Sequence, residues 1–250
     1  MTQLYNTTKA DHLPQYSLDF EASSSQILFR LLDGTASGAA FGEQFSIAFR
    51  FKRETTGVAQ YIFEHRGGGF ANGMYVNFSV AGRLKFLIGA AWSSGGIGTI
   101  QNIYVEGSTK VNDTNWHDAL IVVDLPDATK ADRIRIYLDG VRETAFKSLL
   151  PSVSTALASH KNGRFYTGFA PGVGYYDGLL YNFGIGNGNA QWAVSDVRES
   201  DGTAKDLKDL TDLYMHPDLD AGEVPSDWLL SNWANINGIT ASTIIGDAAT

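Results

Sequence analysis

The chain has 250 residues, of which 44% are hydrophobic and 12% aromatic; it contains no cysteine and carries a formal charge of −8 at pH 7. The lack of cysteine excludes disulfide bonds and thiolate chemistry. No run of Lys or Arg exceeds two residues, and no apolar stretch approaches the ~20 residues of a membrane-spanning helix. We therefore expect neither a nucleic-acid partner nor insertion into a membrane.

Residues 1–14 are polar and irregular, which predicts an N-terminal arm. Beyond this arm, short segments rich in β-branched and aromatic residues recur roughly every 8–12 residues, as strands do in a two-sheet sandwich. We expect a single antiparallel β-sandwich of the jelly-roll type over residues 15–217. The predicted strands cover residues 16–20, 26–32, 45–52, 58–65, 73–80, 83–90, 97–105, a segment from 116, 134–138, 163–168 and 175–186.

Two of these segments show the period of two that marks a half-buried strand. Phe45, Ile47, Phe49 and Phe51 fall on one face of the first segment. In the second, the apolar positions of residues 134–138 lead to Asp139-Gly140, a pair that supplies the positive φ angles of a two-residue hairpin turn.

The pattern changes after residue 188. Leucines at helical spacing over residues 206–214 predict a short helix that ends before Pro217. Residues 218–250 then form a predicted C-terminal arm with much apolar surface. This arm either folds back over its own sandwich or docks on a neighbouring subunit. Its candidate interface residues are Trp228, Leu229, Leu230, Trp233 and Ile236.

Several motifs resemble the laminin-G-like, concanavalin-A-like jelly-roll family. Residues 115–117 (Asn-Trp-His) with 134–140 (Ile-Arg-Ile-Tyr-Leu-Asp-Gly) are similar to the family's Trp-His and Leu-Tyr-x-Asp-Gly core, and residues 176–180 to its Phe-Asp-Gly-x-Ile signature. The resemblance spans about residues 16–216. Three positions depart from it: Arg50 stands for a Trp, Asp118 for a His and Tyr181 for an Asp.

The resemblance implies the β-sandwich fold, but this scaffold serves lectins, hydrolases, adhesins and virion proteins alike. In the resembling family, a structural calcium ion is often held by an acidic residue of the first strand and by the Asp of the Phe-Asp-Gly element. The positions carried over are Glu21 and Asp177. Asp177-Gly178 is equally compatible with a plain turn, and no other cofactor is expected.

A sugar site would need exposed aromatic side chains near polar groups at loop tips. The candidates are Trp92, Tyr175, Tyr176, Phe70 and Asn72, whose alternative role is packing at the rim of the sandwich.

We predict no catalytic residue. The Glu-x-Asp-x-Glu triplet of the scaffold's hydrolases and a Gly-x-Ser-x-Gly motif do not occur, and the five histidines are scattered. We expect His117 to play a structural part beside Trp116.

Three hypotheses for function follow. The first is a non-enzymatic structural protein of a bacteriophage particle (tail, fibre, appendage or capsid decoration), because the sequence has no signal peptide, no cysteine and termini that extend past the core. It implies synthesis in the host cytoplasm, a place in the virion, other virion subunits as partners and self-association. The second is a lectin module for a cell-surface polysaccharide. The third is a polysaccharide-degrading enzyme.

Overall fold

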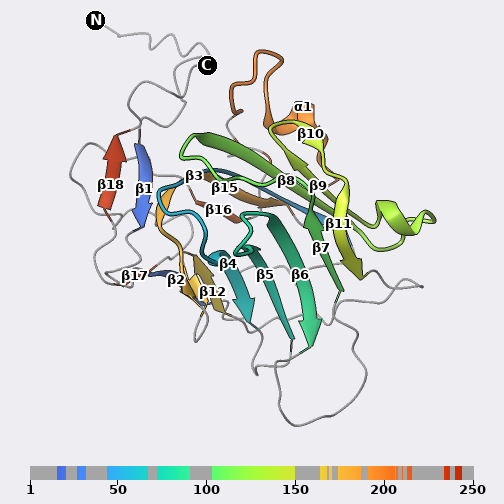
Figure 1. Ribbon diagram of the computed structural model, residues 1–250, viewed down its shortest axis with the longest axis horizontal. Coiled ribbons are helices and arrows are strands. Elements are labelled where there is room, and N and C mark those ends of the chain that lie inside the picture. The colour runs from blue at the N-terminus through green and yellow to red at the C-terminus, as the bar shows by residue number, and fades with distance from the viewer. Residues whose placement is uncertain are drawn as a thin grey trace, which may run out of the picture.

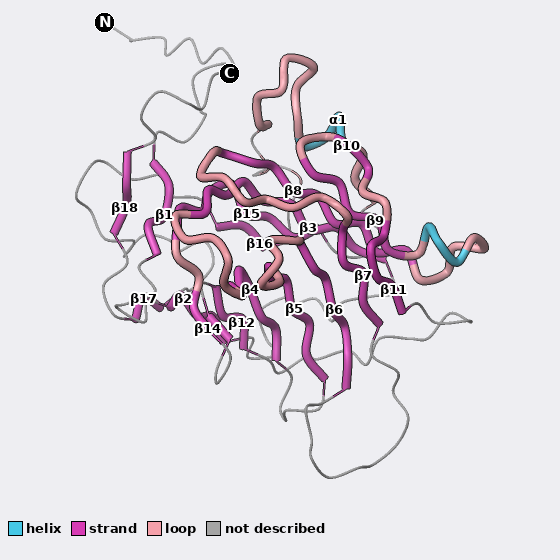
Figure 2. The backbone as a smooth tube through the Cα atoms, viewed as in Figure 1, coloured by secondary structure: helices cyan, strands magenta, loops and turns pink. Residues whose placement is uncertain are grey.

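The computed structural model of the protein describes residues 16–20, 27–31, 44–66, 72–90, 103–149, 164–167, 169–170, 174–186, 191–205, 207, 210, 213–215, 234–236 and 240–243. These residues form two eight-stranded antiparallel sheets, packed face to face, and a separate two-stranded hairpin. Strands dominate the described chain (Figure 2). The predicted jelly-roll β-sandwich is confirmed.

We call the first sheet sheet A. Its strands follow the order β10-β9-β8-β3-β15-β1-β18, and β16 also pairs with β15 (Figure 1). In that order the bounds are β10 (Val141–Arg142), β9 (Ile134–Leu138), β8 (Trp116–Asp124), β3 (Gln44–Arg53), β15 (Gly178–Gly186), β1 (Tyr16–Phe20) and β18 (Thr240–Thr243), with β16 at Leu213–Met215.

The second sheet, sheet B, has the order β11-β7-β6-β5-β4-β12-β2-β17. Its strands are β11 (Ala145–Leu149), β7 (Ile103–Gly107), β6 (Leu84–Ala90), β5 (Asn72–Phe78), β4 (Gln60–Arg66), β12 (Arg164–Thr167), β2 (Ile27–Leu31) and β17 (Ala234–Ile236). The hairpin of β13 (Phe169–Ala170) and β14 (Gly174–Tyr175) lies against β4. The helical elements are α1 (Val194–Val197) and the 3₁₀ helix η2 (Lys130–Asp132), and no described helix is long and apolar enough to span a bilayer.

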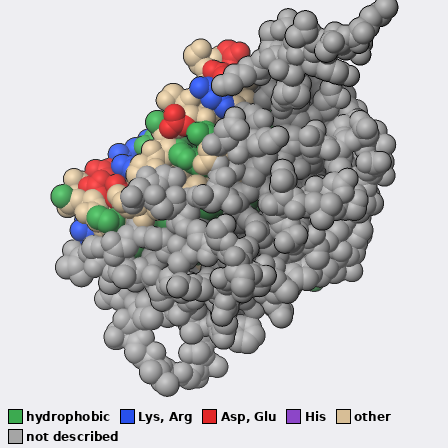
Figure 3. Space-filling view, turned by 180° about the vertical axis from the view of Figure 1, so that it is seen from behind, with side chains coloured by type: hydrophobic (Ala, Val, Ile, Leu, Met, Phe, Trp, Pro, Cys, Tyr) green, Lys and Arg blue, Asp and Glu red, His purple; other side chains and the backbone are tan. Residues whose placement is uncertain are grey.

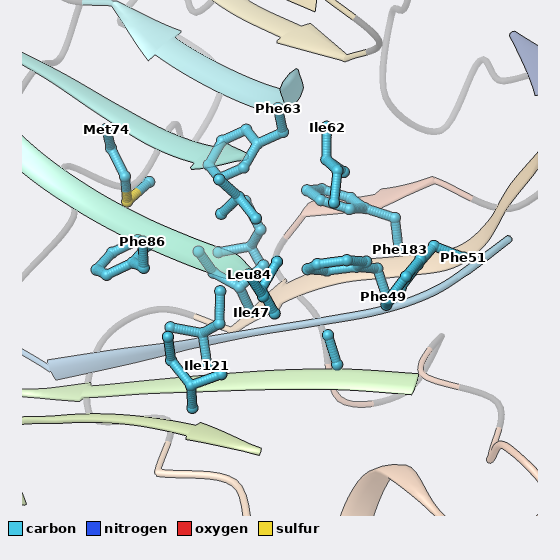
Figure 4. Close-up of a cluster of buried hydrophobic side chains, with 14 of the residues drawn as sticks. Ile47, Phe49, Phe51, Ile62, Phe63, Met74, Leu84, Phe86, Ile121 and Phe183 are labelled. Atoms are coloured by element: carbon cyan, nitrogen blue, oxygen red, sulfur yellow. The ribbon is translucent and has the colours of Figure 1, made fainter. Parts of the chain in front are cut away.

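The core lies between the two sheets and is built largely from aromatic rings (Figure 4). Phe45, Ile47, Phe49 and Phe51 all face it, as the alternation of β3 predicted, and each is at most 2% exposed. Phe51 meets Phe78 of sheet B with ring centroids 5.0 Å apart. At about 25 cal/mol per Å² of apolar area, such a layer dominates the stability of the sandwich.

A second, smaller core covers part of the outer face of sheet A. Ala48, Leu120 and Val122 point away from the main core and pack under Trp192 and Leu207. The segment that supplies this cover, residues 191–207, includes α1. As a result, β8 and β3 are buried on both faces along much of their length.

Among the residues of the helix predicted over 206–214, those that the structure describes do not lie in a helix. Leu213 and Tyr214 lie in β16, where they pair with Ile185 and Gly184 of β15. Leu207 has no helical assignment and packs into the second core instead. The described α-helix is α1, about twelve residues earlier in the chain.

The described part of residues 218–250 belongs to the molecule's own sheets. β17 pairs with β2 at one edge of sheet B, and β18 pairs with β1 at one edge of sheet A. The sheets therefore extend past residue 217. Of the two alternatives for this arm, these residues follow the first, in which it folds back over its own sandwich. Of the candidate interface residues, Ile236 ends β17, whereas Trp228, Leu229, Leu230 and Trp233 lie outside the described residues.

Two turns depend on positive φ angles. Asp139 and Gly140 have φ of 51° and 79°, which confirms the predicted hairpin turn between β9 and β10. Gly178 has φ of 141°, and a Cβ added there would lie 2.1 Å from the carbonyl oxygen of Lys52. Only glycine fits where β15 comes so close to β3.

We expect Gly178→Ala to lower the free energy of unfolding by about 3 kcal/mol or more, because backbone strain and a clash with a fixed carbonyl add together. Gly57 is the matched control: its φ is 77°, but nothing lies within 4 Å of an added Cβ. Gly57→Ala should cost only about 1 kcal/mol of left-handed strain. Denaturant unfolding of both variants checks this, and equal losses would contradict the clash.

Candidate functional site

The structure describes the sequence-predicted sugar residues only in part. Trp92 and Phe70 lie outside the described residues, Asn72 is the first residue of β5, and Tyr175 is half-buried in β14. Apart from Tyr176, the predicted sugar residues stay a prediction.

The prediction that Tyr176 stacks on a sugar is wrong, because this residue belongs to the core. It is 1% exposed and meets Phe20 edge-on at a centroid distance of 6.0 Å. Its hydroxyl lies 2.9 Å from the carbonyl oxygen of Lys52 and 3.1 Å from that of Leu179. Burial raises the pKa of this hydroxyl. A hydrogen bond to the backbone thus allows the polar tip of the ring to be buried.

The predicted calcium ligands are described only in part. The side chain of Asp177 accepts a hydrogen bond from the hydroxyl of Thr55, and its carbonyl oxygen accepts one from the amide of Glu54 at 3.1 Å. Glu21 lies outside the described residues. Over the described chain, no three His, Asp or Glu side chains converge to hold a metal. The calcium site stays a prediction.

His117 locks the β9–β10 turn. Its Nδ1 lies 2.7 Å from Oδ2 of Asp139, the turn residue, and its Nε2 lies 2.9 Å from Oδ1 of Asp113. The ring stacks on Phe51 at 5.6 Å, and Asp139 also accepts a hydrogen bond from the amide of Asp118. These contacts fit the structural part expected for His117.

The two carboxylates also set the protonation of this imidazole. Burial alone would lower the pKa of His117, but the hydrogen bonds and charges of Asp139 and Asp113 outweigh it and raise the pKa above 6.5. In return, the pKa values of Asp113 and Asp139 are lowered. Burial alone would raise them, but the hydrogen bond from His117, a backbone hydrogen bond and the charge of His117 together outweigh it. The group is an ion triad that fixes a turn.

The three departures from the family pattern meet in one row on the outer face of sheet A. Tyr181 pairs with Arg50 across β15 and β3, and Arg50 pairs with Asp118 across β3 and β8. The guanidinium carbon of Arg50 lies 5.8 Å from the ring centre of Tyr181 and 5.7 Å from that of Trp116. Arg50 is only 5% exposed, so it replaces the usual Trp with a cation stacked between aromatic rings.

Asp118 supplies the opposite charge in this row. Its Oδ1 lies 3.7 Å from Nε of Arg50, and its Oδ2 binds Nη1 of Arg198. Burial raises the pKa of Asp118 against the opposing charges of Arg50 and Arg198. Arg198 follows α1 and passes between Gly140 and Gly202, where a Cβ would crowd it. It therefore clamps the covering segment onto sheet A.

A groove of about 580 Å³ lies at the open edge of the sandwich, between β9 and β11. Its rim is polar, and two of its charged side chains are engaged: Arg142 pairs with Asp132, and Glu143 accepts hydrogen bonds from the amide and hydroxyl of Thr109, both at 2.7 Å. Nε of Arg135, by contrast, is buried without a hydrogen-bond partner. The floor of the groove is formed by Val105, Ile134 and Ile136.

The outer face of sheet B offers a better arrangement, which we call the platform. It consists of six residues on β5, β6 and β7, at positions that alternate with the core-facing residues of those strands. They form two adjacent cross-strand rows: Tyr75, Leu87 and Tyr104 in one, Asn77, Lys85 and Glu106 in the other.

The first row of the platform is largely aromatic. Tyr75 and Tyr104 are half-buried, with Leu87 registered between them. Tyr61 of β4 meets Tyr75 edge-on with centroids 6.3 Å apart, which fixes the ring of Tyr75. Nζ of Lys85 lies 4.9 Å from the ring centre of Tyr104. The row is thus a rigid, partly open aromatic surface.

The second row carries unused hydrogen-bonding capacity. Nδ2 of Asn77 lies 3.5 Å from the carbonyl oxygen of Phe78, at the limit of a hydrogen bond. Across the described structure, neither Nζ of Lys85 nor the carboxylate of Glu106 makes a hydrogen bond or an ion pair. Polar groups beside exposed rings, left without protein partners, are typical of a ligand site.

Sequence reasoning missed the platform because it considered loop tips only. The sequence predicts strands over residues 73–80 and 83–90, which contain Tyr75, Asn77, Lys85 and Leu87, but assigns no face to these residues. What the sequence lacked was the register that sets these residues beside Tyr104 and Glu106.

The molecular surface seen from behind is mixed in character. The described side chains in this view lie along one margin, where Lys and Arg, Asp and Glu, and hydrophobic side chains alternate (Figure 3). That strip lacks the single-sign charge of a nucleic-acid-binding surface.

Comparison with known proteins identifies the family. Residues 30–194 match the family model of the concanavalin A-like lectin/glucanases superfamily, here its laminin G type. The chain belongs to this superfamily. The match covers β3 to β15, which include the platform, the Arg50 row and the His117 triad. A search of curated proteins found no significant match.

Several solved structures have a fold similar to that of this chain, at low sequence identity. A proposed carbohydrate-binding protein from Bacteroides ovatus aligns over 94% of this chain and 62% of its own, with a TM-score of 0.62 and 13% identity. A heptameric SAP-like pentraxin from Limulus polyphemus aligns over 94% and 97%, with a TM-score of 0.56 and 12% identity.

A third structure is the CBM40 of a Ruminococcus gnavus sialidase bound to α2,3 sialyllactose. It aligns over 74% of this chain and 95% of its own, with a TM-score of 0.51 and 11% identity. At these identities the likeness establishes the fold alone.

The His117 triad predicts a pH effect. The stabilisation from the raised pKa of His117 is complete below about pH 6.5 and is lost as the pH rises through the folded-state pKa. In NMR titrations, Asp113→Asn should lower the pKa of His117. Asp127→Asn is the control, because Asp127 accepts a similar hydrogen bond from the amide of Thr129 and makes no hydrogen bond with a described histidine. A His117 pKa unchanged in Asp113→Asn would refute the triad.

The Arg198 clamp predicts a large loss of stability. Arg198→Ala should lower the free energy of unfolding at pH 7 by about 3 kcal/mol, because it leaves the buried Asp118 with only the distant Arg50. The deficit should shrink as the pH falls and Asp118 is protonated.

Arg142→Ala, which breaks the more exposed pair with Asp132, is the control and should cost about 0–1 kcal/mol. Urea unfolding at several pH values measures both variants, and equal losses would mean that Arg198 clamps nothing.

Proposed function

We propose that this chain is a non-catalytic carbohydrate-binding module whose glycan lies on the platform. The observation that carries the proposal is the pairing, on the outer face of sheet B, of an aromatic row with a polar row. Within the described structure, Asn77 makes one hydrogen bond at 3.5 Å, and neither Nζ of Lys85 nor the carboxylate of Glu106 makes any. Sugars present apolar C–H faces and polar edges, and they are bound by stacking on aromatic rings with hydrogen bonds at the side.

The position of the platform also supports this proposal. Its residues stand on three neighbouring strands whose opposite faces are locked in the main core, as Val76, Phe86 and Val105 are. A site on strands is held more rigidly than one on loops, so little ordering is needed when a flexible polysaccharide binds.

The structural neighbours agree with this reading. The Bacteroides ovatus protein is described as carbohydrate-binding, and the Ruminococcus gnavus module holds a sialylated sugar. Both share the fold of this chain.

The acidic groups of this chain also favour binding over hydrolysis. Glycoside hydrolysis requires two carboxyl groups that flank one bond. Asp113 and Asp139 instead hold His117, and the platform contains a single carboxylate, Glu106. The polysaccharide-degrading enzyme is therefore not the function that we propose.

The role in a bacteriophage particle, with self-association and synthesis in a host cytoplasm, stays a prediction from the sequence. It is compatible with a glycan-binding module, because many copies on one particle would gain avidity by ~10²–10⁴ over a single weak site. Sedimentation of the full chain tests self-association. Deleting residues 218–250 would not test it cleanly, since β17 and β18 belong to the sheets.

Tyr104→Ala should weaken binding to the module's polysaccharide by about tenfold or more, because it removes a stacking surface from the platform. Screening on a glycan array, followed by calorimetry, measures the effect. Tyr175→Ala and Trp92→Ala are the matched controls and should bind as the unaltered protein does. Loss of binding in either control, with Tyr104→Ala unaffected, would move the site to the loops and contradict the platform.

A further inference from the structure

Glu106 is the platform residue whose burial without a partner the fold explains least. It is only 9% exposed, yet its carboxylate makes no hydrogen bond or ion pair in the described structure. Lys85 and Lys147 lie directly opposite it on the neighbouring strands. Neither lysine brings its Nζ within 4.0 Å of the carboxylate, and that of Lys85 sits over the ring of Tyr104 instead.

Glu106 is largely buried as a residue, but its carboxylate oxygens are not among the fully buried side-chain atoms without a partner, so they still reach water. A ligand that displaces this water must supply donors in its place, because a carboxylate left without hydrogen bonds is unfavourable. A carboxylate has two oxygens that only accept hydrogen bonds, so what it lacks is a pair of adjacent donors. A ligand that supplies two neighbouring hydroxyl groups meets this need at both oxygens.

Glu106 lies next to the aromatic row of the platform. Tyr104 and Glu106 are two residues apart on β7, so they point to the same face about 6.6 Å apart along the strand. A sugar ring bound against Tyr104, beside the Nζ of Lys85 that already approaches the ring centre to 4.9 Å, therefore lies next to Glu106. Lys85 and Asn77 lie beside Glu106 in the polar row and supply donors to the oxygens of the sugar.

We propose that the platform recognises a neutral pyranose, and that the carboxylate of Glu106 accepts hydrogen bonds from two adjacent hydroxyl groups of the sugar. This inference rests on the proposed function and names its substrate class. A sugar carboxylate at the same place would lie against Glu106, and like charges repel strongly where water is largely excluded. Glu106 thus selects against acidic glycans as well as binding neutral ones.

The test uses the full chain and two glycan series. The neutral series is galactan, arabinan, mannan and soluble starch; the acidic series is polygalacturonate, alginate and sialyllactose. Glu106→Gln keeps the shape of the side chain but replaces one acceptor by a donor and removes the charge. We expect the unaltered protein to bind a neutral glycan, and Glu106→Gln to bind it about 10- to 100-fold more weakly.

A ligand-side measurement separates recognition from damage to the fold. Competition with the matching monosaccharide and its monodeoxy derivatives should show that two adjacent hydroxyl groups are needed. Removing either hydroxyl should weaken binding to the unaltered protein but have little further effect on Glu106→Gln, because the partner is already lost. Lys147→Gln, on the exposed edge strand, is the control and should change affinity by less than about threefold.

The outcomes distinguish this inference from the proposed function. If the unaltered protein binds nothing in either series, the proposed function fails. If Tyr104→Ala weakens binding but Glu106→Gln does not, or if an acidic glycan is preferred and Glu106→Gln binds it more tightly, the platform stands and the role of Glu106 is overturned.

Discussion

The burial of the central strands of sheet A on both faces is the constraint on which the rest of the structure depends. β3 and β15 face the main core on one side and, on the other, the second core and the Arg50 row. An antiparallel strand in such a position has no solvated face, so any polar residue on it must be paired inside the protein. The covering segment around α1, the Arg198 clamp and the His117-fixed turn all serve that requirement.

Two buried arginines on β3 meet this requirement to different degrees, since Nε and Nη1 of Arg50 are buried without a hydrogen-bond partner. Arg53 is fully buried, and its guanidinium donates to Gln60, to the carbonyl oxygen of Val111 and to that of Val58. Arg50 relies on aromatic faces and on one loose contact with Asp118. The arrangement around Arg50 needs Trp116, Tyr181 and Asp118 together. This explains why three departures from the family pattern stand next to one another, since a change at one position would leave a buried charge without its neighbours.

The sequence allowed the strands and the core faces to be predicted, because a period of two states directly which side chains are buried. It misplaced the helix because Leu207, Leu210 and Leu213 have a spacing that also fits a strand end and a covering loop, and pairing with β15 decided the outcome. Tyr176 was misassigned because a tyrosine after a glycine-rich stretch suggests a loop tip, whereas its hydroxyl finds backbone carbonyls inside the core. We did not predict the platform from the sequence, because its residues come together only through cross-strand register. A single sequence does not specify that register.

The two sheets thus differ in what happens to their outer faces. On sheet A, the chain covers its own polar row and neutralises it with Asp118 and Arg198 from neighbouring elements. On sheet B, the row of Asn77, Lys85 and Glu106 is left without such partners although the sheet beneath it is just as firmly packed. Lys85 lies directly opposite Glu106 on the neighbouring strand but does not turn toward it. That Lys85 instead lies on Tyr104 leaves acceptors and donors side by side, which is the arrangement that the hydroxyl groups of a sugar require.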